Sequence, residues 1–340
     1  MAKTMHGLVC LNDGYSGSMD GPYVDDLAPY LEHREVDIPE PGDGEVLIRV
    51  IMASVNPSDI HFIKGEYGVP RHAGVPAGFE ACGEVVASGK GGEGIVGKRV
   101  AFFASRSGVW AEYAIANAMT CIPVRDDVRD EDAAAMLVNP MTAIGMYDEA
   151  TAKSDAFIMT AAASQLCKLI AGLAKEDKSQ AIAIVRRDEQ IDHLKELGAA
   201  HVLNYKSDEF SKELGDLTKK HKPRVLLDAV ADQMSAEIFF SMPKHARWII
   251  YGKLSPELPK LNEMGQLIFM NKRIEGFWLT QWMKEKPVNE QIAAAIRVQE
   301  MFASGKWQTD IADKIPLSKV HDRLPALLSK MNAGKVLITP

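Results

Sequence analysis

The sequence predicts an α/β fold in which a doubly wound parallel-sheet domain is inserted into a β-rich domain. The 340 residues exceed what one hydrophobic core usually holds, so we expect two domains. The first third has short apolar runs between Gly and Pro residues, the middle alternates strand and helix patterns, and the first style returns from about Thr309. We therefore expect residues 126–305 to form the inserted domain, and residues 1–125 and 306–340 to form the β-rich domain.

Short strands are predicted throughout the β-rich part, where turn residues such as the glycine-heavy segment SGKGGEGIVG separate them. Regularly spaced short strands of this kind indicate a compact β domain. The predicted strands are residues 45–53, 83–87, 99–103 and 110–115 and the C-terminal run GKVLITP.

The middle of the chain has a different pattern. Residues 130–150 combine good helix formers with helical spacing and predict a helix. The strand DAFIMTA then precedes the helix LCKLIAGLAKE, and the strand AIAIV precedes the helix DEQIDHLKELG. Three more apolar runs follow, AHVLNY, RVLLDAV and RWIIYG. Strands that alternate with helices predict βαβ units around a parallel sheet, which is the Rossmann arrangement.

The composition argues against several classes of protein. Hydrophobic residues make up 46% of the chain and charged residues 25%, which is typical of a folded domain. The net charge of -7 makes nucleic acid a poor partner, because phosphate binding needs a concentrated basic surface. We find no apolar run of membrane-spanning length and no signal-peptide pattern, so we expect no membrane partner. The four cysteines are far apart, so we expect no disulfide framework and a cytoplasmic protein.

The turn after DAFIMTA lies where a Rossmann fold binds the phosphates of a dinucleotide. Such a turn needs small residues, for close approach of the backbone, and the N–H groups of a helix N-terminus. Ala162, Ser164 and Cys167 replace the usual three glycines, but the turn residues are small and Ser164 can cap the helix. An ordinary strand-to-helix turn is the alternative. The cofactor-binding candidates are Ala163, Ser164, Gln165 and Leu166.

The end of the second predicted Rossmann strand favours NADPH over NADH. Arg186 and Arg187 follow AIAIV, about where an NAD enzyme places an acidic residue for the ribose hydroxyls. Two guanidinium groups there would pair with a 2′-phosphate, which a carboxylate would repel. The alternative is a solvated arginine pair. Further cofactor-binding candidates at the ends of later strands are Tyr205, Tyr251 and Gly252.

Five motifs together resemble the medium-chain dehydrogenase/reductase superfamily, and most closely its zinc-free quinone oxidoreductases and enoyl reductases. They are VNPSDIHFIKGEYG, PAGFEACGEV, GKRV, GVWAEYAIA and NPMTA, and the resemblance runs from about residue 45 to the C-terminus. It implies a GroES-like catalytic domain, an inserted Rossmann domain, a cleft between them and a homodimer.

The same resemblance predicts that no zinc is bound. Zinc-dependent members carry a cysteine just before the Ser-Asp pair and a histidine before the glutamate, where this chain has Pro57 and Phe79. Neither side chain can ligate a metal. We expect the nearby His61 and His72 to be solvated loop residues.

Without a metal, a substrate that spreads developing charge suits the site, so we expect a quinone or an α,β-unsaturated carbonyl. We expect Tyr67 to lie on the loop after a short helix. It matches the tyrosine that donates a proton in the enoyl thioester reductases, and a phenol can stabilise or protonate an enolate. Asn56 is the second catalytic candidate, as an amide near the nicotinamide or the substrate. The alternatives are that Tyr67 only lines the site and that Asn56 only forms an Asn-Pro turn.

The resemblance also implies residues at the nicotinamide end. Thr142 matches a position where family members touch the nicotinamide. The segment EGFWLTQW resembles the sixth Rossmann strand and dimer edge of enoyl thioester reductases, which places Phe277, Trp278 and Leu279 near the nicotinamide or the partner chain. Packing inside the domain is the alternative for all four residues.

Three functions remain open on the sequence. The first is an NADPH-dependent quinone or enone reductase. The second is a trans-2-enoyl thioester reductase that uses Tyr67 as acid, for which Arg71, His72, Lys90 and Arg106 are the only nearby candidates for a basic entrance. The third is an NADPH-binding sensor or scaffold without turnover, which the loss of the glycine motif leaves possible.

Overall fold

The computed structural model describes residues 3–328 and 334–340. It separates into two compact units, Met1–Asn139 with Ala295–Pro340 and, between these segments of the chain, Pro140–Ala294. The second unit is shorter than the predicted domain of residues 126–305. The reason is that residues on both flanks pack within the first unit: α2 (Asp130–Ala134) contacts β3 and β4, and the Arg125 N–H donates to Gln299 Oε1 at 3.0 Å.

The first unit is built on a seven-stranded, mostly antiparallel sheet with the order β14-β15-β3-β4-β5-β7, and β6 also pairs with β3. The strand β15 pairs antiparallel with β3, so the C-terminal end of the chain lies beside the centre of this sheet. The strands are β3 (Glu45–Ser54), β4 (Glu80–Ser88), β5 (Arg99–Phe103), β6 (Tyr113–Asn117), β7 (Ile122–Pro123), β14 (Ile311–Pro316) and β15 (Lys335–Thr339).

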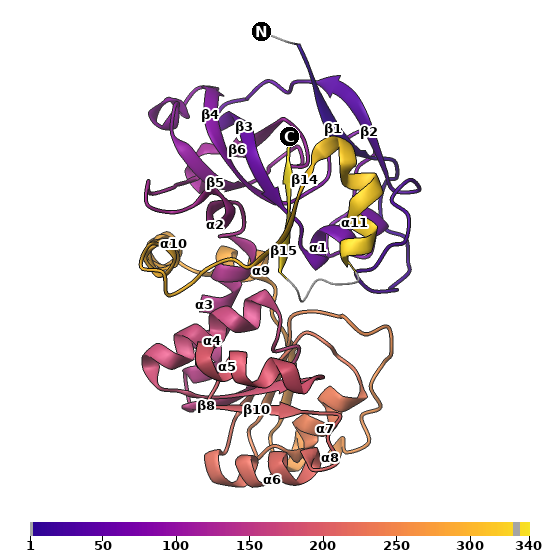
Figure 1. Cartoon of the computed structure of the whole chain (residues 1–340), viewed down its shortest axis with the longest axis vertical. Coiled ribbons are helices and arrows are strands. Elements are labelled where there is room, and N and C mark those ends of the chain that lie inside the picture. The colour runs from indigo at the N-terminus through magenta and orange to yellow at the C-terminus, as the bar shows by residue number, and fades with distance from the viewer. Residues whose placement is uncertain (1–2, 329–333) are drawn as a thin grey trace. The chain divides into compact units, whose positions relative to one another are not determined.

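Two elements of this unit have no counterpart in the sequence prediction. The hairpin of β1 (Thr4–Cys10) and β2 (Leu31–Asp37) forms a separate two-stranded sheet. Most residues of β2 are polar and only its first is buried, so the strand lacks a strong apolar signal. The helix α11 (Val320–Leu328) lies beside β14 and buries Val320, Leu324 and Leu328 (Figure 1).

Two local predictions need correction. The strand expected at residues 110–115 begins only at Tyr113, because the backbone N–H groups of Trp110 and Glu112 donate to the Ala77 and His6 carbonyls and not to β3. The single helix expected at residues 130–150 is two helices, α2 and α3 (Val138–Thr151). Between them the N–H groups of Leu137 and Val138 donate to the Glu80 carboxylate instead of continuing a helical ladder.

The second unit confirms the doubly wound prediction. Its six strands are all parallel, in the order β10-β9-β8-β11-β12-β13, so the sheet grows outward in both directions from β8. This order is typical of a Rossmann fold, in which ligands bind at the carboxyl ends of the strands near the point of reversal. The strands are β8 (Ala156–Met159), β9 (Gln180–Val185), β10 (His201–Asn204), β11 (Val225–Asp228), β12 (Arg247–Ile250) and β13 (Arg273–Gly276).

Helices connect these strands, and a core that includes Ile158, Ile182, Leu226 and Trp248 is buried in this unit. The helices of the chain not yet named are α1 (Pro57–Lys64), α4 (Gln165–Asp177), α5 (Ile191–Leu197), α6 (Phe210–His221), α7 (Gln233–Ser241), α8 (Gly265–Phe269), α9 (Leu279–Glu285) and α10 (Val288–Ala303). The described residues also form four short 3₁₀ helices, Glu93–Ile95, Ala118–Thr120, Asp188–Gln190 and Leu317–Lys319.

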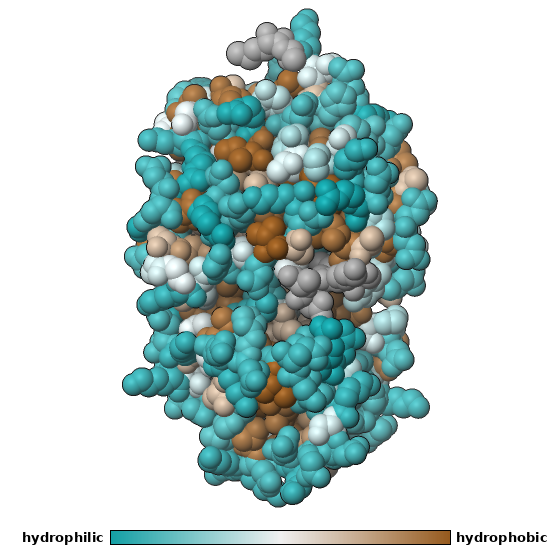
Figure 2. Space-filling view, viewed as in Figure 1, coloured by the Kyte–Doolittle hydropathy of each residue, from teal (hydrophilic) through white to brown (hydrophobic). Residues whose placement is uncertain are grey.

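The surface is mixed in character. The face in Figure 2 is mostly hydrophilic, and its hydrophobic residues form separate patches. Within residues 3–328 and 334–340, no helix is both long and apolar enough to cross a lipid bilayer.

Candidate functional site

The turn between β8 and α4 has the geometry of a small-residue turn at a helix N-terminus. Ser164 is the N-cap of α4, and its hydroxyl accepts from the Cys167 N–H at 3.3 Å. Ala161 has a φ of 47°, in the left-handed region that glycine occupies without strain. Ala162 is fully buried, whereas Ala163 is half-buried. The turn thus combines small residues with a capped helix N-terminus, an arrangement that favours an anion.

Cys167 does not block this turn. Its side chain is fully buried under the turn, where the sulfur lies 3.5 Å from the Thr160 carbonyl oxygen and 3.4 Å from the Tyr251 hydroxyl. Gln165 and Leu166 form the first turn of α4, with Leu166 buried and Gln165 half-buried. The predicted residues 163–166 and Tyr251 therefore meet around the carboxyl ends of β8 and β12.

Arg186 and Arg187 are both exposed directly after β9, but they differ in their partners. Arg187 Nε lies 3.3 Å from Glu189 Oε1. For Arg186 we find no ion pair with any described residue. Its guanidinium is therefore the more available group for a bound phosphate, a distinction that the sequence did not make.

The remaining strand ends carry the other predicted adenosine and nicotinamide residues. Tyr205 is half-buried after β10, and the Lys206 ammonium lies 4.8 Å from the centre of its ring. Gly252 follows β12 next to Ala229, whose carbonyl oxygen would lie 3.2 Å from a Cβ at this glycine. A larger residue at position 252 would therefore crowd the carboxyl edge of the sheet.

The segment after β13 packs against helix α3. Thr142 is buried on α3, and a Cβ on Gly145, one turn later, would lie 3.0 Å from Phe277 Cζ, so Phe277 packs on this helix. Trp278 is the N-cap of α9 and is exposed, and Leu279 is its half-buried first residue. The segment EGFWLTQW contributes only its first two residues to a strand, since β13 ends at Gly276.

A buried carboxylate that the sequence analysis missed supports this edge. Asp228, the last residue of β11, is fully buried and accepts from the Thr160 and Ser235 hydroxyls and from the Trp248 indole N–H. The Ser235 and Trp248 contacts are 2.9 and 2.8 Å. Asp228 therefore links the ends of β8, β11 and β12. Its signal in the sequence was an acidic residue that directly follows an apolar strand.

In the first unit, Asn56 belongs to a buried polar cluster, which we define as Ser54, Asn56, Asp59, Glu80 and Lys335. The Asn56 amide donates to Ser54 Oγ at 3.0 Å and to Glu80 Oε1 at 2.8 Å, and its oxygen accepts from the Lys335 ammonium. Both N–H bonds of the amide are thus committed inside the cluster. The predicted role of Asn56 at the substrate stays a prediction, and it would require one of these bonds to be exchanged.

The cluster contains one ammonium and two carboxylates. The second oxygen of Glu80 accepts the N–H groups of Leu137 and Val138, and Asp59 accepts those of Asn56 and Phe79 at 2.7 and 2.9 Å. Burial raises the pKa of Asp59 to about 7, whereas these two N–H bonds and Lys335 act in the opposite direction. Burial lowers the pKa of Lys335, and the two carboxylates oppose that change.

The positions that we compared with zinc ligands hold no ligating atoms. Pro57 is the first residue of α1, and the Phe79 ring packs between Phe62 and Tyr67 at centroid distances of 5.1 and 5.2 Å. Over the described part of the chain, no three His, Cys, Asp or Glu side chains lie close enough together to hold a metal ion.

Tyr67 follows α1 on a loop, as predicted, and is half-buried against Phe79. His61 is not the solvated loop residue that we expected. It lies within α1, and its Nδ1 is 3.0 Å from the Glu66 carboxylate. The sequence signal that we missed was a histidine and a glutamate on either side of Gly65, which ends the helix in a left-handed conformation with φ 78°.

The proposed basic entrance is weaker than the sequence suggested. Arg71 is buried and donates to the Ile63 carbonyl at 2.8 Å, so it is not a surface charge. Arg106 is exposed but pairs with Glu45, its Nε lying 2.8 Å from Oε1.

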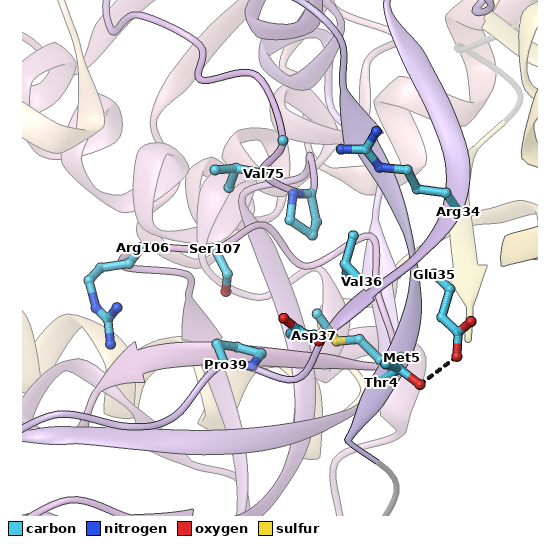
Figure 3. A pocket seen from close by; sticks show the side chains of 12 residues that line it. Thr4, Met5, Arg34, Glu35, Val36, Asp37, Pro39, Val75, Arg106 and Ser107 are labelled. Carbon is cyan, nitrogen blue, oxygen red and sulfur yellow. Dashed lines mark hydrogen bonds between the residues drawn. The ribbon is translucent and has the colours of Figure 1, made fainter.

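Arg106 also lines an open hollow of about 720 Å³, which Figure 3 shows with Arg34, Glu35 and Asp37 on its walls. This hollow mixes charges of both signs. Its described lining includes none of the predicted site residues.

Two family profiles match separate parts of the chain. The alcohol dehydrogenase GroES-like domain matches residues 42–126, and the zinc-binding dehydrogenase domain matches residues 162–294. The second match lies outside positions 57 and 79, so its name carries no evidence for zinc here.

Curated relatives and solved structures match over most of the chain. An enoyl-[acyl-carrier-protein] reductase, mitochondrial, from Xenopus tropicalis is 30% identical over 84% of this chain and 85% of its own length. The crystal structure of a candidate NADPH:quinone reductase from Mesorhizobium loti is 49% identical, with a TM-score of 0.95 over 100% of this chain and 99% of that one. A mitochondrial 2-enoyl thioester reductase heterodimer from Candida tropicalis shares the fold, with 21% identity and a TM-score of 0.82 over 100% of both chains.

We predict that Lys335→Met lowers the free energy of unfolding by about 3–5 kcal/mol, because it leaves the buried Glu80 and Asp59 carboxylates without their cation. The loss should be smaller near pH 5 than near pH 7, since removal of the ammonium raises the pKa of Asp59 and makes protonation easier. Urea unfolding at both pH values measures this. Lys314→Met is the matched control, because Lys314 pairs with Glu131 near the surface and should contribute less than about 1 kcal/mol. Equal losses for the two variants would contradict the prediction.

Proposed function

Because the chain belongs to the medium-chain dehydrogenase/reductase superfamily, in its zinc-free quinone oxidoreductase and enoyl reductase branch, we propose that it is a zinc-independent reductase that uses NADPH. The predicted family, the GroES-like and Rossmann fold class and the assignment as an oxidoreductase are confirmed by these matches. The substrate that we propose is a quinone or an α,β-unsaturated carbonyl, in line with the named activity of the Mesorhizobium loti protein.

The observation that carries the cofactor assignment is the exposed guanidinium of Arg186, directly after β9 in a Rossmann sheet. In this fold the residue after the second strand contacts the adenine ribose, and a cation there suits a 2′-phosphate. The small-residue turn at Ser164 fits the pyrophosphate, and Gly252 leaves space at the carboxyl edge. When bound, NADPH would supply a hydride. The chain's own residues would hold the adenosine end, exclude water and provide the proton.

A second candidate, a trans-2-enoyl thioester reductase, is favoured by one feature of the structure. Tyr67 is half-buried on the loop after α1, and its ring packs on Phe79 at a centroid distance of 5.2 Å, so packing holds the phenol in place. The named activity of the curated relatives supports the same candidate. The buried Arg71 argues against a strongly basic entrance for a phosphate-bearing thioester.

We also propose that the functional unit is a homodimer formed along β13. This strand is the last of its sheet, its residues are largely exposed, and its outer side pairs with no described strand. Exposed apolar side chains lie near it in the sequence: Ile268 at 75%, Phe269 at 87% and Ile274 at 36%. A bare strand edge with exposed apolar residues favours a second copy of the same strand across a two-fold axis.

The four free, buried cysteines fit a cytoplasmic location, which isolation of the protein from an oxidising compartment would contradict.

For the cofactor, we predict that Arg186→Ala weakens NADPH binding by about 10-fold or more, because a charge-assisted hydrogen bond contributes about 1.5–3 kcal/mol. NADH binding should change little. Arg187→Ala is the matched control and should have the smaller effect, since Glu189 already partners Arg187. Fluorescence titration of both reduced cofactors measures the difference. An equal loss for NADPH and NADH would show that the phosphate site lies elsewhere.

For the substrate, a steady-state screen of NADPH oxidation with quinones, enals and enoyl-CoA tests the proposed function. We predict that Tyr67→Phe slows enoyl thioester reduction by about 10²-fold or more, the usual scale for loss of a general acid. Quinone reduction should be spared, because water can protonate its product. If no substrate in the panel supports NADPH oxidation, the result would favour a sensor over an enzyme. An equal loss with both substrate classes would contradict the role of Tyr67 as acid.

For the dimer, we predict that Ile274→Lys converts the protein to a monomer, because an ammonium on a bare strand edge opposes pairing with a second copy. Val96→Lys is the matched control, since Val96 is an exposed apolar residue of the first unit. Sedimentation velocity distinguishes one chain from two. A monomeric wild-type protein, or dissociation by both variants, would contradict the proposed edge.

A further inference from the structure

A hollow of about 330 Å³ lies at the amino ends of β11, β12 and β13, with the end of α3 on one side. All of its described lining residues belong to the second unit. A Rossmann fold binds its dinucleotide at the carboxyl ends of the strands, so this hollow lies at the opposite edge of the sheet. Its described lining includes none of the residues predicted to bind the cofactor.

The lining of the hollow is strongly basic. Glu149 is the one carboxylate among its described lining residues, and it lies 2.9 Å from the Arg247 guanidinium. Arg247 also pairs with Glu275 on β13. Four cations therefore face two carboxylates, in a chain whose net charge is -7. The cations come from four separate segments of the chain: Lys153, Arg224, Arg247 and Arg273.

Two of these arginines lie side by side. Arg247 and Arg273 are register partners on the parallel strands β12 and β13, so their side chains point to the same face of the sheet. Like charges directly opposite each other destabilise a sheet unless an anion compensates them. Glu149 and Glu275 compensate Arg247, but no described carboxylate pairs with Arg273. The guanidinium of Arg273 is therefore available to an anion from outside the chain.

Stabilisation of the fold accounts for only two of the four cations. Arg224 donates to the Lys244 carbonyl, and Arg247 to the Glu149 carbonyl at 3.5 Å, near the ends of helices where cations are favourable. Lys153 and Arg273 are exposed, and we find no ion pair or hydrogen bond from their side chains to any described residue. A purely structural role leaves these two charges unexplained.

The rim of the hollow adds polar donors held by the backbone. His245 and Asn271 both adopt left-handed conformations, with φ of 66° and 48°, and the His245 N–H donates to the Met270 carbonyl at 2.8 Å. The Asn271 amide nitrogen lies 3.2 Å from His245 Nδ1. An amide nitrogen can only donate, so Nδ1 accepts and the ring proton of the neutral imidazole is on Nε2, which can donate to a ligand.

We propose that this hollow binds a compact oxyanion with two or more negative charges, carried by phosphate or carboxylate groups. Guanidinium groups bind both kinds of oxyanion through paired hydrogen bonds. The volume is at the small end of the range for ligand sites. Apart from the imidazole of His245, the described lining has no aromatic ring on which a nucleotide base would stack. The site does not depend on the proposed reductase activity.

Calorimetric titration of the full chain with inorganic pyrophosphate and with citrate tests the site. The wild-type protein should bind at least one of them with a Kd below about 1 mM. Arg273→Gln should weaken that binding by about 10-fold, because charge-assisted hydrogen bonds are lost. Lys153→Met should weaken it less, since an ammonium is a single point charge. Lys195→Met is the matched control and should leave the affinity unchanged, because Lys195 is an exposed cation on α5, which packs near β10 at the other edge of the sheet.

Binding that weakens in Arg273→Gln but not in Lys195→Met supports the site, and pyrophosphate alone or citrate alone identifies the ligand as a phosphate or a carboxylate. The absence of binding by both anions, or equal losses in these two variants, would overturn it. Pyrophosphate also suits the proposed cofactor site, so the titration is repeated with Arg186→Ala. An affinity that depends on Arg186 and not on Arg273 would place the anion in the cofactor site and overturn this proposal alone.

Discussion

The buried pairing of Lys335 with Asn56 and the two nearby carboxylates is the interaction on which the first unit depends. Lys335 opens the last strand of the chain, whereas Asn56 is the N-cap of α1, so the contact joins residues 279 positions apart in the sequence. Two carboxylates in a dry interior are costly unless a cation and N–H donors compensate them. The cluster therefore couples the C-terminal strand, the start of α1 and the start of α3 in a single polar network.

The second unit solves a different electrostatic problem. A dinucleotide brings its own negative charges, so a site for it should keep positive groups uncommitted and let the backbone approach closely. In the proposed site, alanines and Ser164 would allow that approach, although Ala161 adopts a left-handed backbone that glycine would adopt more easily. The carboxylate of Asp228 is engaged within the sheet, because its oxygens accept hydrogen bonds from Thr160, Ser235 and Trp248. The carboxyl edge thus holds one internally bonded carboxylate and, after β9, the exposed guanidinium of Arg186.

The sequence predicted the parts of the fold that depend on local periodicity. The β8–α4–β9 unit follows from apolar spacing, and the short helix predicted before Tyr67 is α1. The buried carboxylates with several hydrogen-bond donors were not predictable in this way. Glu80 takes its donors from Ser54, Asn56 and two residues more than 55 positions later, and no local pattern encodes such partners. The mostly polar strand β2 was missed for a related reason, since its partner is the distant β1.

The hydrogen bonds of the first unit also limit which of its side chains can exchange a proton. Asn56 has both amide hydrogens engaged, and Asp59 has both oxygens engaged by backbone N–H groups. Neither can exchange a proton with a substrate unless the buried cluster rearranges. His61 is different, because Glu66 engages only Nδ1 and leaves Nε2 as the titrating nitrogen. In the proposed reduction the proton comes from a side chain or from water, and the bonding pattern makes the buried Asn56 cluster an unfavourable source.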